Sequence, residues 1–206
     1  MAKRAFDVIL ASAALVLLSP ALCALAIIVR FNSPGPALYR GERVGRHGVP
    51  FGMLKFRTMV VDADRLGGPS ASDDDPRVTR IGRFMRRSKL DELPQLINVV
   101  AGHMSLVGPR PEVPQEVATY TAVERHLLSV RPGMTDYASI RFYNEGEILK
   151  GAGDPHEAYR RLIRPEKMRL GLEYVRTASL LVDLKIIAMT LALGMGVGKG
   201  TATLSR

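Results

Sequence analysis

The stretch AFDVILASAALVLLSPALCALAIIV, residues 5–29, is almost wholly apolar, and it decides the class of fold to which this chain belongs. Only Asp7, Ser12 and the pair Ser19-Pro20 interrupt it. A straight helix of this length would reach roughly 37 Å at about 1.5 Å per residue, which is enough to cross a bilayer. The segment therefore predicts a membrane element at the start of the chain.

Three structures compete for this segment: a secretory signal, a helix that crosses the membrane, and a helix that enters one leaflet and returns. A signal is disfavoured because no small-x-small cleavage pattern ends the run. Lys and Arg flank the segment on both sides, and such flanks are typical of the cytoplasmic face. Pro20 removes the hydrogen bond to the Val16 carbonyl, and the Ser19 hydroxyl can satisfy that carbonyl. We therefore expect a re-entrant helical hairpin over residues 1–31.

Composition limits the remaining architecture and the kind of partner. With 206 residues, 47% of them hydrophobic, the chain can form one domain with a sizeable core plus a membrane element. A net charge of +9 calls for an anionic partner, and nucleic acid, an anionic membrane surface and a phosphorylated substrate all qualify. The single cysteine, Cys23, excludes a disulfide framework and a cysteine-based metal site.

Beyond residue 32 the pattern predicts an α+β domain that is mostly helical. Two short strands, 36–40 and 49–59, are expected to form a β-hairpin through a connection at 41–48 that is rich in Gly and Arg. A basic amphipathic helix is expected at 78–87, where it suits an anionic membrane surface. Helices are also expected at 165–176 and 180–193. The last is strongly apolar but too short to span, so it is expected to lie in the membrane interface, and a buried core helix is the alternative.

Two adjacent carboxylates, Asp91 and Glu92, begin an apolar helix expected at 90–100 and ended by Gly102. Neighbouring helical positions lie about 100° apart, so one acid can face a site while the other supports it or binds a metal. Alternatively, both acids simply occupy the first helical turn, where negative charge favours the positive end of the dipole. Asp91 is the candidate reactive group.

Cations accompany this pair. Lys55 and Arg57 are expected on one face of the second strand, where they can meet an anion or remain solvated. Arg110 lies between Pro109 and Pro111, and this rigid turn presents a guanidinium that suits a phosphate or a planar base.

Several motifs together carry a resemblance to a known family. The chain is similar, from about Arg4 to about Met195, to the bacterial sugar transferases, which are small monotopic phosphoglycosyl transferases. The motifs that carry the similarity are, in order, KFRTM (55–59), DPRVT (75–79), LDELPQ (90–95), SLVGPRP (105–111), RPG (131–133) and LVDLK (181–185). Members of this family carry a re-entrant helix with a Ser-Pro breakpoint, which Ser19-Pro20 would provide.

The resemblance implies a reaction. A nucleotide sugar, usually a UDP-sugar, gives its sugar-1-phosphate to a polyprenyl phosphate such as undecaprenyl phosphate, UMP is released, and glycan assembly starts on the lipid. Asp91 would be the nucleophile that forms a covalent phosphosugar intermediate, and Glu92 its metal-binding or positioning partner. Mg²⁺ would assist, with Asp91 and Glu92 as the expected metal residues. The resemblance also implies substrate-contacting side chains, namely Lys55, Arg57, Arg86, Pro109, Arg110, Pro111 and Asp183.

It further implies a place in the cell and a division of the chain. Residues 1–31 would anchor the protein monotopically in the bacterial inner membrane, and residues 32–206 would form a catalytic domain on its cytoplasmic face, with membrane lipids as partners. The segment Gly133–Ser139 departs from the commoner family pattern, which bears on the identity of the sugar rather than on the reaction.

Two rival functions remain at this stage. A nucleic-acid-binding protein would explain the charge but would leave the apolar segment and the acidic pair unused, so nucleic acid is not expected as a partner. A non-catalytic membrane scaffold would use the cations only for lipid headgroups. A homodimer is compatible with the sequence, although no heptad pattern argues for one.

Overall fold

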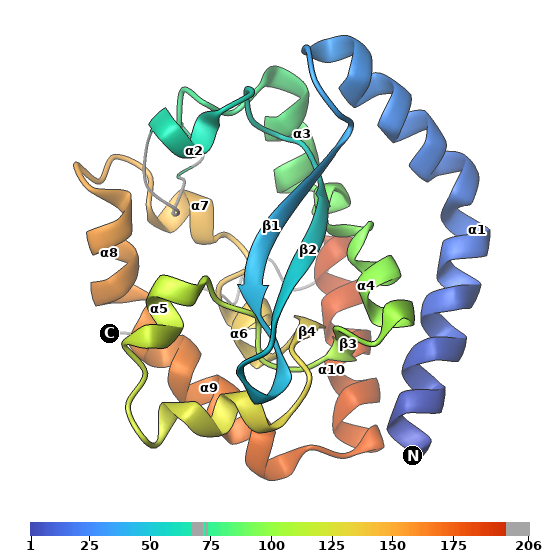
Figure 1. Ribbon diagram of the computed structural model, residues 1–206, viewed down its shortest axis with the longest axis vertical. Coiled ribbons are helices and arrows are strands. Elements are labelled where there is room, and N and C mark those ends of the chain that lie inside the picture. Colours follow the sequence, from blue (N-terminus) through green and yellow to red (C-terminus); the bar gives the residue numbers. More distant parts are fainter. Residues whose placement is uncertain (67–71, 73, 197–206) are drawn as a thin grey trace.

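The computed structural model describes residues 1–66, 72 and 74–196, and the last ten residues of the expected catalytic domain lie outside this range. The fold is mostly helical with a short antiparallel β-hairpin, as predicted, and α1 runs along one side of the body (Figure 1). The longer helices are α1 (Ala2–Asn32), α3 (Arg80–Arg87), α4 (Gln95–Ala101), α8 (Pro155–Leu162), α9 (Arg164–Thr177) and α10 (Leu180–Gly194). Short helical segments are η1 (Arg46–Gly48), α2 (Ala63–Leu66), η2 (Leu90–Glu92), α5 (Pro114–Ala118), η3 (Glu124–Ser129), α6 (Tyr137–Arg141) and α7 (Glu145–Ile148).

α1 is one continuous helix of 31 residues with Pro20 inside it, rather than two helices in a hairpin. The Ser19 hydroxyl donates to the Val16 carbonyl at 2.8 Å, which is the carbonyl that Pro20 leaves without its amide partner. Because this local bond satisfies the freed carbonyl, the helix curves instead of breaking (Figure 1). The expected Ser-Pro chemistry is therefore present, whereas a hairpin with two separate arms is not.

Both ends of α1 are attached to the same body. At the amino end, the Arg4 guanidinium donates to the Val99 and Val100 carbonyls of α4 at 2.6 and 2.9 Å. At the carboxyl end, the Arg57 guanidinium donates to the carbonyls of the turn at 33–36. Between these clamps α1 buries few residues, although it is long and apolar enough to cross a membrane, with a mean hydropathy of 2.5. Its outer face is therefore an apolar surface that no described part of the chain covers.

The strands form two small sheets. β1 (Leu38–Val44) and β2 (Pro50–Phe56) pair antiparallel, with Leu38 opposite Phe56. The first strand is longer than predicted and takes in residues 41–44, so the connection shortens to 45–49. β3 (Ser105–Val107) pairs in parallel with β4 (Gly133–Thr135), and this second sheet was not predicted.

The helices expected at 78–87, 165–176 and 180–193 appear as α3, α9 and α10, within two residues at each end. The helix expected at 90–100 is divided into η2 and α4, and it ends as predicted at Gly102, whose φ of 89° is left-handed. The position of α3 and α10 relative to a membrane remains a prediction, as does the domain boundary at residue 31.

Candidate active site

The acidic pair lies in η2, between the basic helix α3 and the apolar helix α4. Lys89, with φ of 56°, turns the chain sharply before it, and the tight helical turn then sends the two side chains in different directions. Asp91 is only 5% exposed, and its Oδ1 atom has no hydrogen-bond partner among the described residues. A buried oxygen without a partner is costly, so this atom marks Asp91 as a candidate functional group.

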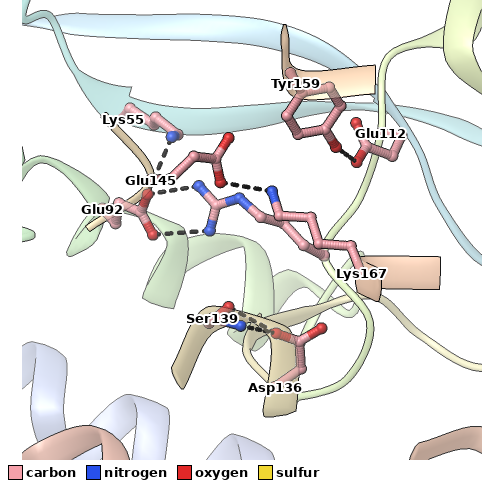
Figure 2. A network of polar contacts seen from close by, with 9 residues as sticks. Lys55, Glu92, Glu112, Asp136, Ser139, Glu145, Tyr159 and Lys167 are labelled. Carbon is pink, nitrogen blue, oxygen red and sulfur yellow. Dashed lines mark hydrogen bonds and ion pairs between the residues drawn. The ribbon is translucent and has the colours of Figure 1, made fainter. Parts of the chain in front are cut away.

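Glu92 is held by two cations. Its Oε1 atom accepts from Lys55 Nζ at 3.2 Å and from Arg110 Nη2 at 2.5 Å, and its Oε2 atom accepts from Arg110 Nη1 at 3.1 Å. Figure 2 shows Lys55 and Glu92 facing each other in this network. The two-pronged contact with Arg110 fixes the carboxylate plane as well as its charge. Glu92 therefore aligns the cations beside Asp91.

The pKa shifts separate the two acids. Burial raises the pKa of Asp91, with the charge of Lys55 opposing this effect and that of Glu92 adding to it. Burial also acts on Glu92, but the charges of Arg110 and Lys55 outweigh it and hold the Glu92 pKa well below its usual range. Burial lowers the pKa of Lys55, and Glu92 opposes that change. The pair thus combines an acid whose pKa is lowered with one whose pKa is raised, and a more basic carboxylate is the better nucleophile.

The turn that carries Arg110 is built by the β3–β4 sheet. Gly108 N donates to the Thr135 carbonyl and Gly133 N donates to the Pro109 carbonyl, both at 3.0 Å. The two backbones approach so closely that a Cβ atom on Gly133 would lie 2.1 Å from Gly108 N. Only glycine permits this contact, which fixes the Pro-Arg-Pro turn and with it the guanidinium.

The remaining predicted substrate contacts divide. Arg86 lines the same cleft and donates from Nε to Thr58 Oγ1 at 2.9 Å. Arg57 also borders the cleft, but the hydrogen bonds described for its guanidinium go to the carbonyls at 33–36, so it does not share the position of Lys55 beside Glu92. Asp183 is fully buried and does not line the cleft: Lys3 Nζ lies 2.7 Å from it and Tyr174 OH donates to it at 2.8 Å. We therefore remove Asp183 from the site and assign it to the attachment of α10.

Sequence reasoning missed the opposite wall of the site, formed by α6 to α9. There Lys167 Nζ lies 2.6 Å from Glu145 Oε2, and Tyr159 OH donates to Glu112 Oε1 at the same distance (Figure 2). Glu145 also helps to raise the pKa of Arg110, after the larger effect of Glu92. No motif marks these residues, because they lie far apart in the sequence and the segment around Glu145 has the composition of a surface loop.

An open cleft of about 1810 Å³ lies between the acidic pair with its cations and the opposite wall of α6 to α9. It is lined by both acids of the pair and by Lys55, Arg86 and Arg110. We tested whether the site fits Mg²⁺. The described residues include no group of three or more His, Cys, Asp or Glu side chains that could enclose an ion. Mg²⁺ often takes only one or two carboxylates and completes its shell with substrate phosphates and water. Asp91 lines the cleft and fits that mode as the one protein carboxylate, whereas both oxygens of Glu92 already accept hydrogen bonds.

Comparison with known proteins gives a consistent picture. A family model described as bacterial sugar transferase matches residues 1–196. A UDP-glucose:undecaprenyl-phosphate glucose-1-phosphate transferase of Escherichia coli is 40% identical over 195 residues, which are 93% of this chain but only 40% of the relative. The exopolysaccharide production protein PSS of Rhizobium leguminosarum is 37% identical over 96% of this chain and 97% of its own length. A putative undecaprenyl-phosphate N-acetylgalactosaminyl 1-phosphate transferase of Bacillus subtilis is 48% identical over 54% of this chain and 63% of its own length.

Proposed function

This chain belongs to the bacterial sugar transferase family, and on that basis we propose that it transfers a sugar-1-phosphate from a UDP-sugar to a polyprenyl phosphate, such as undecaprenyl phosphate, and releases UMP. The product would start the assembly of a membrane glycan. The observation that carries the proposal is the buried, unpartnered carboxylate of Asp91 beside a Glu92 clamped by two cations. The name of the Escherichia coli relative supports a UDP-sugar donor and an undecaprenyl phosphate acceptor, and that of the Rhizobium leguminosarum relative supports a role in exopolysaccharide production.

The reaction would proceed in two displacements at one phosphorus. An oxygen of Asp91 attacks the phosphorus that bears the sugar, and the bond from this phosphorus to the bridging oxygen breaks, so UMP leaves with that oxygen. A phosphate oxygen of the acceptor then attacks the same phosphorus, and the bond to Asp91 breaks. The product is a polyprenyl diphosphate sugar, and the carboxylate is regenerated.

The cations have separate tasks in this scheme. A carboxylate is a weak nucleophile, so the negative charge of the diphosphate must be neutralised. Lys55 and Arg110 are aligned by Glu92 for this purpose, and Arg86 lies on the same cleft. Mg²⁺, held by Asp91 and by substrate phosphates, would supply further charge neutralisation when bound. In this scheme Glu92 acts as a positioning group, which the bonds of both its carboxylate oxygens to Lys55 and Arg110 support.

We further propose that the protein is monotopic, with α1 in one leaflet of the bacterial inner membrane and the site on the cytoplasmic face. A helix that crossed the bilayer would have its two ends on opposite sides. Both ends of α1 instead bond to the same body, through Arg4 and Arg57. The exposed apolar side chains of α10 and the basic helix α3 would lie at the membrane interface, in contact with lipid.

The proposed activity can be tested with purified protein, Mg²⁺ and a panel of labelled UDP-sugars. Wild-type protein should release UMP from at least one donor and transfer label to undecaprenyl phosphate, while Asp91→Asn should be inactive. Removal of Mg²⁺ by EDTA should stop the reaction, and added Mg²⁺ should restore it. Full activity of Asp91→Asn would overturn the assignment of the nucleophile. Membrane binding without turnover of any nucleotide sugar would favour the scaffold instead.

A further inference from the structure

The lining of the cleft that contains Asp91 combines two kinds of side chain. The cations Lys55 and Arg110 lie against the acidic pair, whereas α1, β3, β4 and α10 contribute apolar side chains. The apolar part, which we call the acceptor groove, is lined by Leu10, Ala14, Leu106, Met134, Ile187 and Leu191. A ligand that filled both parts would have a charged head and a long apolar tail.

The groove has two helical walls and a floor of strands. α1 contributes Leu10 and Ala14, and α10 contributes Ile187 and Leu191. The floor consists of Leu106 from β3 and Met134 from β4, which both pack against core residues beneath. In the chain, Leu106 precedes the turn of Arg110 by only four residues, so the floor of the groove leads directly to the guanidinium. The apolar and cationic parts are therefore parts of one continuous site.

Polar groups along this path are satisfied internally. Thr190 Oγ1 and Thr135 Oγ1 lie 2.7 Å apart, and the Thr190 hydroxyl also contacts the Ile186 carbonyl at 2.8 Å. The hydroxyls of α10 and β4 thus bond to protein and not to a ligand, which leaves an apolar surface for an apolar occupant.

The outer faces of both helices are apolar as well. On α1 the side chain of Leu17 is 79% exposed, and on α10 those of Leu181 and Leu184, which do not line the cleft, are 79% and 49% exposed. Exposed side chains of this kind belong in lipid rather than in water. If α1 and α10 contact the membrane, the groove between them opens into the hydrocarbon layer, and an apolar chain could enter without crossing water.

We propose that the acceptor groove holds the isoprenoid chain of the polyprenyl phosphate acceptor and delivers its phosphate to the side of the cleft with Lys55 and Arg110. This inference rests on the proposed function and adds the residues that bind the acceptor. It follows that the two half-reactions use separable parts of the cleft. The donor needs the cationic part alone, whereas a long acceptor needs the groove as well.

The test is to fill the groove and measure the half-reactions separately. Ala14→Phe places a bulky side chain in the groove, and Ala13→Phe makes the same change at the neighbouring exposed position of α1, which does not line the cleft. The first half-reaction is followed as exchange of labelled UMP into the UDP-sugar without acceptor. The second is followed as transfer to undecaprenyl phosphate and, in parallel, to the much shorter farnesyl phosphate.

Ala14→Phe should keep UMP exchange within about twofold of wild type while kcat/KM for undecaprenyl phosphate falls roughly tenfold or more, which corresponds to about 1.4 kcal/mol. The loss with farnesyl phosphate should be smaller, and Ala13→Phe should resemble wild type in every assay. Ile187→Phe, on the opposite wall, should also retain UMP exchange and lose kcat/KM for undecaprenyl phosphate. Agreement between the two variants would show that the effect does not come from a folding defect at position 14.

Several results would overturn the inference. Equal losses of kcat/KM with undecaprenyl phosphate and farnesyl phosphate would mean that the groove does not bind the long isoprenoid chain. Loss of UMP exchange in both groove variants would mean that the groove is not separable from the donor site. A defect that added phospholipid repairs equally for both acceptors would assign the groove to a structural lipid. Failure of the proposed function would give a different result. In that case none of the UDP-sugars tested would exchange labelled UMP, even with wild-type protein.

Discussion

At the scale of single residues, Asp91 and Glu92 are neighbours in the chain but meet different surroundings. Asp91 is buried and Glu92 is partly buried. Glu92 faces two cations, whereas Asp91 lines the cleft and its buried Oδ1 atom has no hydrogen-bond partner among the described residues. The sequence predicted that the two acids would divide their roles, because adjacent helical positions diverge. It could not predict which acid would form ion pairs with the cations, because Lys55 and Arg110 come from segments that are distant in the sequence.

This division predicts a specific pH dependence. Asp91 must be ionised to attack, and since its pKa is raised, UMP release should fall off on the acid side at a pH above about 3.9, the value of a free aspartate. Glu92→Gln removes a negative neighbour that raises the Asp91 pKa, so the acid limb should move to lower pH. The rate itself should fall roughly 100-fold, because Arg110 loses its alignment. The measurement is kcat/KM for UMP release as a function of pH, which reports the free enzyme.

Glu145→Gln is the matched control for this experiment. It neutralises another carboxylate of the same cleft, but Glu145 is not among the largest influences on the Asp91 pKa, which are burial, Lys55, Glu92, Arg86 and Lys89. Its acid limb should stay where it is in wild-type protein. An unmoved limb in Glu92→Gln, or one displaced to higher pH, would contradict the coupling between the two acids.

At the scale of elements, α1 illustrates how local and distant contacts share control of a helix. The bond from Ser19 to the Val16 carbonyl is local, and it was predictable from the Ser-Pro pair. Continuity through Pro20 depends also on packing, because Leu22 and Leu25 lie against Phe56 and Met85 of the body. The supporting residues belong to β2 and α3, which are distant in sequence from α1. The sequence of residues 1–31 alone therefore favoured a break in the helix at Pro20.

The hydrogen bonds of Arg4, which form the amino-terminal clamp of α1, should have a measurable effect on stability. Arg4 donates to the Val99 and Val100 carbonyls in the last turn of α4, which carries the negative end of the helix dipole. Arg4→Ala should lower the free energy of unfolding by about 2 kcal/mol, which for a chain of this size lowers the thermal midpoint by roughly 4–8 °C. The midpoint can be followed by circular dichroism in detergent micelles.

Two further variants make this measurement decisive. Arg4→Lys keeps the charge but loses the two-carbonyl fork, so its midpoint should lie between those of wild type and Arg4→Ala. Arg125→Ala removes an exposed arginine for which no side-chain bond is described, and it should leave the midpoint unchanged. Equal midpoints for Arg4→Ala and Arg125→Ala would show that the clamp contributes nothing to stability.

At the scale of the whole molecule, the two clamps of α1 lead to a prediction of topology. In a background of Cys23→Ser, cysteines introduced at Ala2 and Phe31 should react with a membrane-impermeant maleimide from the same, cytoplasmic side. Both positions are exposed in the structure, so their labelling depends on the membrane alone. A cysteine at Val16, which is 76% exposed in the structure, should be protected by lipid. Labelling of the two ends from opposite sides would mean that α1 crosses the bilayer.

The sequence by itself determined the features that depend on neighbours in the chain. These include the apolar length of α1, the Ser-Pro contact, the hairpin of β1 and β2, the rigid Pro-Arg-Pro turn and the end of α4 at Gly102. Motif order was also sufficient to indicate the family. Each of these follows from local backbone chemistry or from a pattern of residue types. Both depend only on the order of residues along the chain.

Only the tertiary structure decided which side chains meet. The β3–β4 pairing, the removal of Asp183 from the site and the pairing of Glu145 with Lys167 all join segments that are distant in sequence. The acceptor groove likewise exists only because α1 and α10, from opposite ends of the chain, flank the same strands. Such contacts depend on how the burial of apolar surface is shared among all elements at once, and no short stretch of sequence encodes that balance.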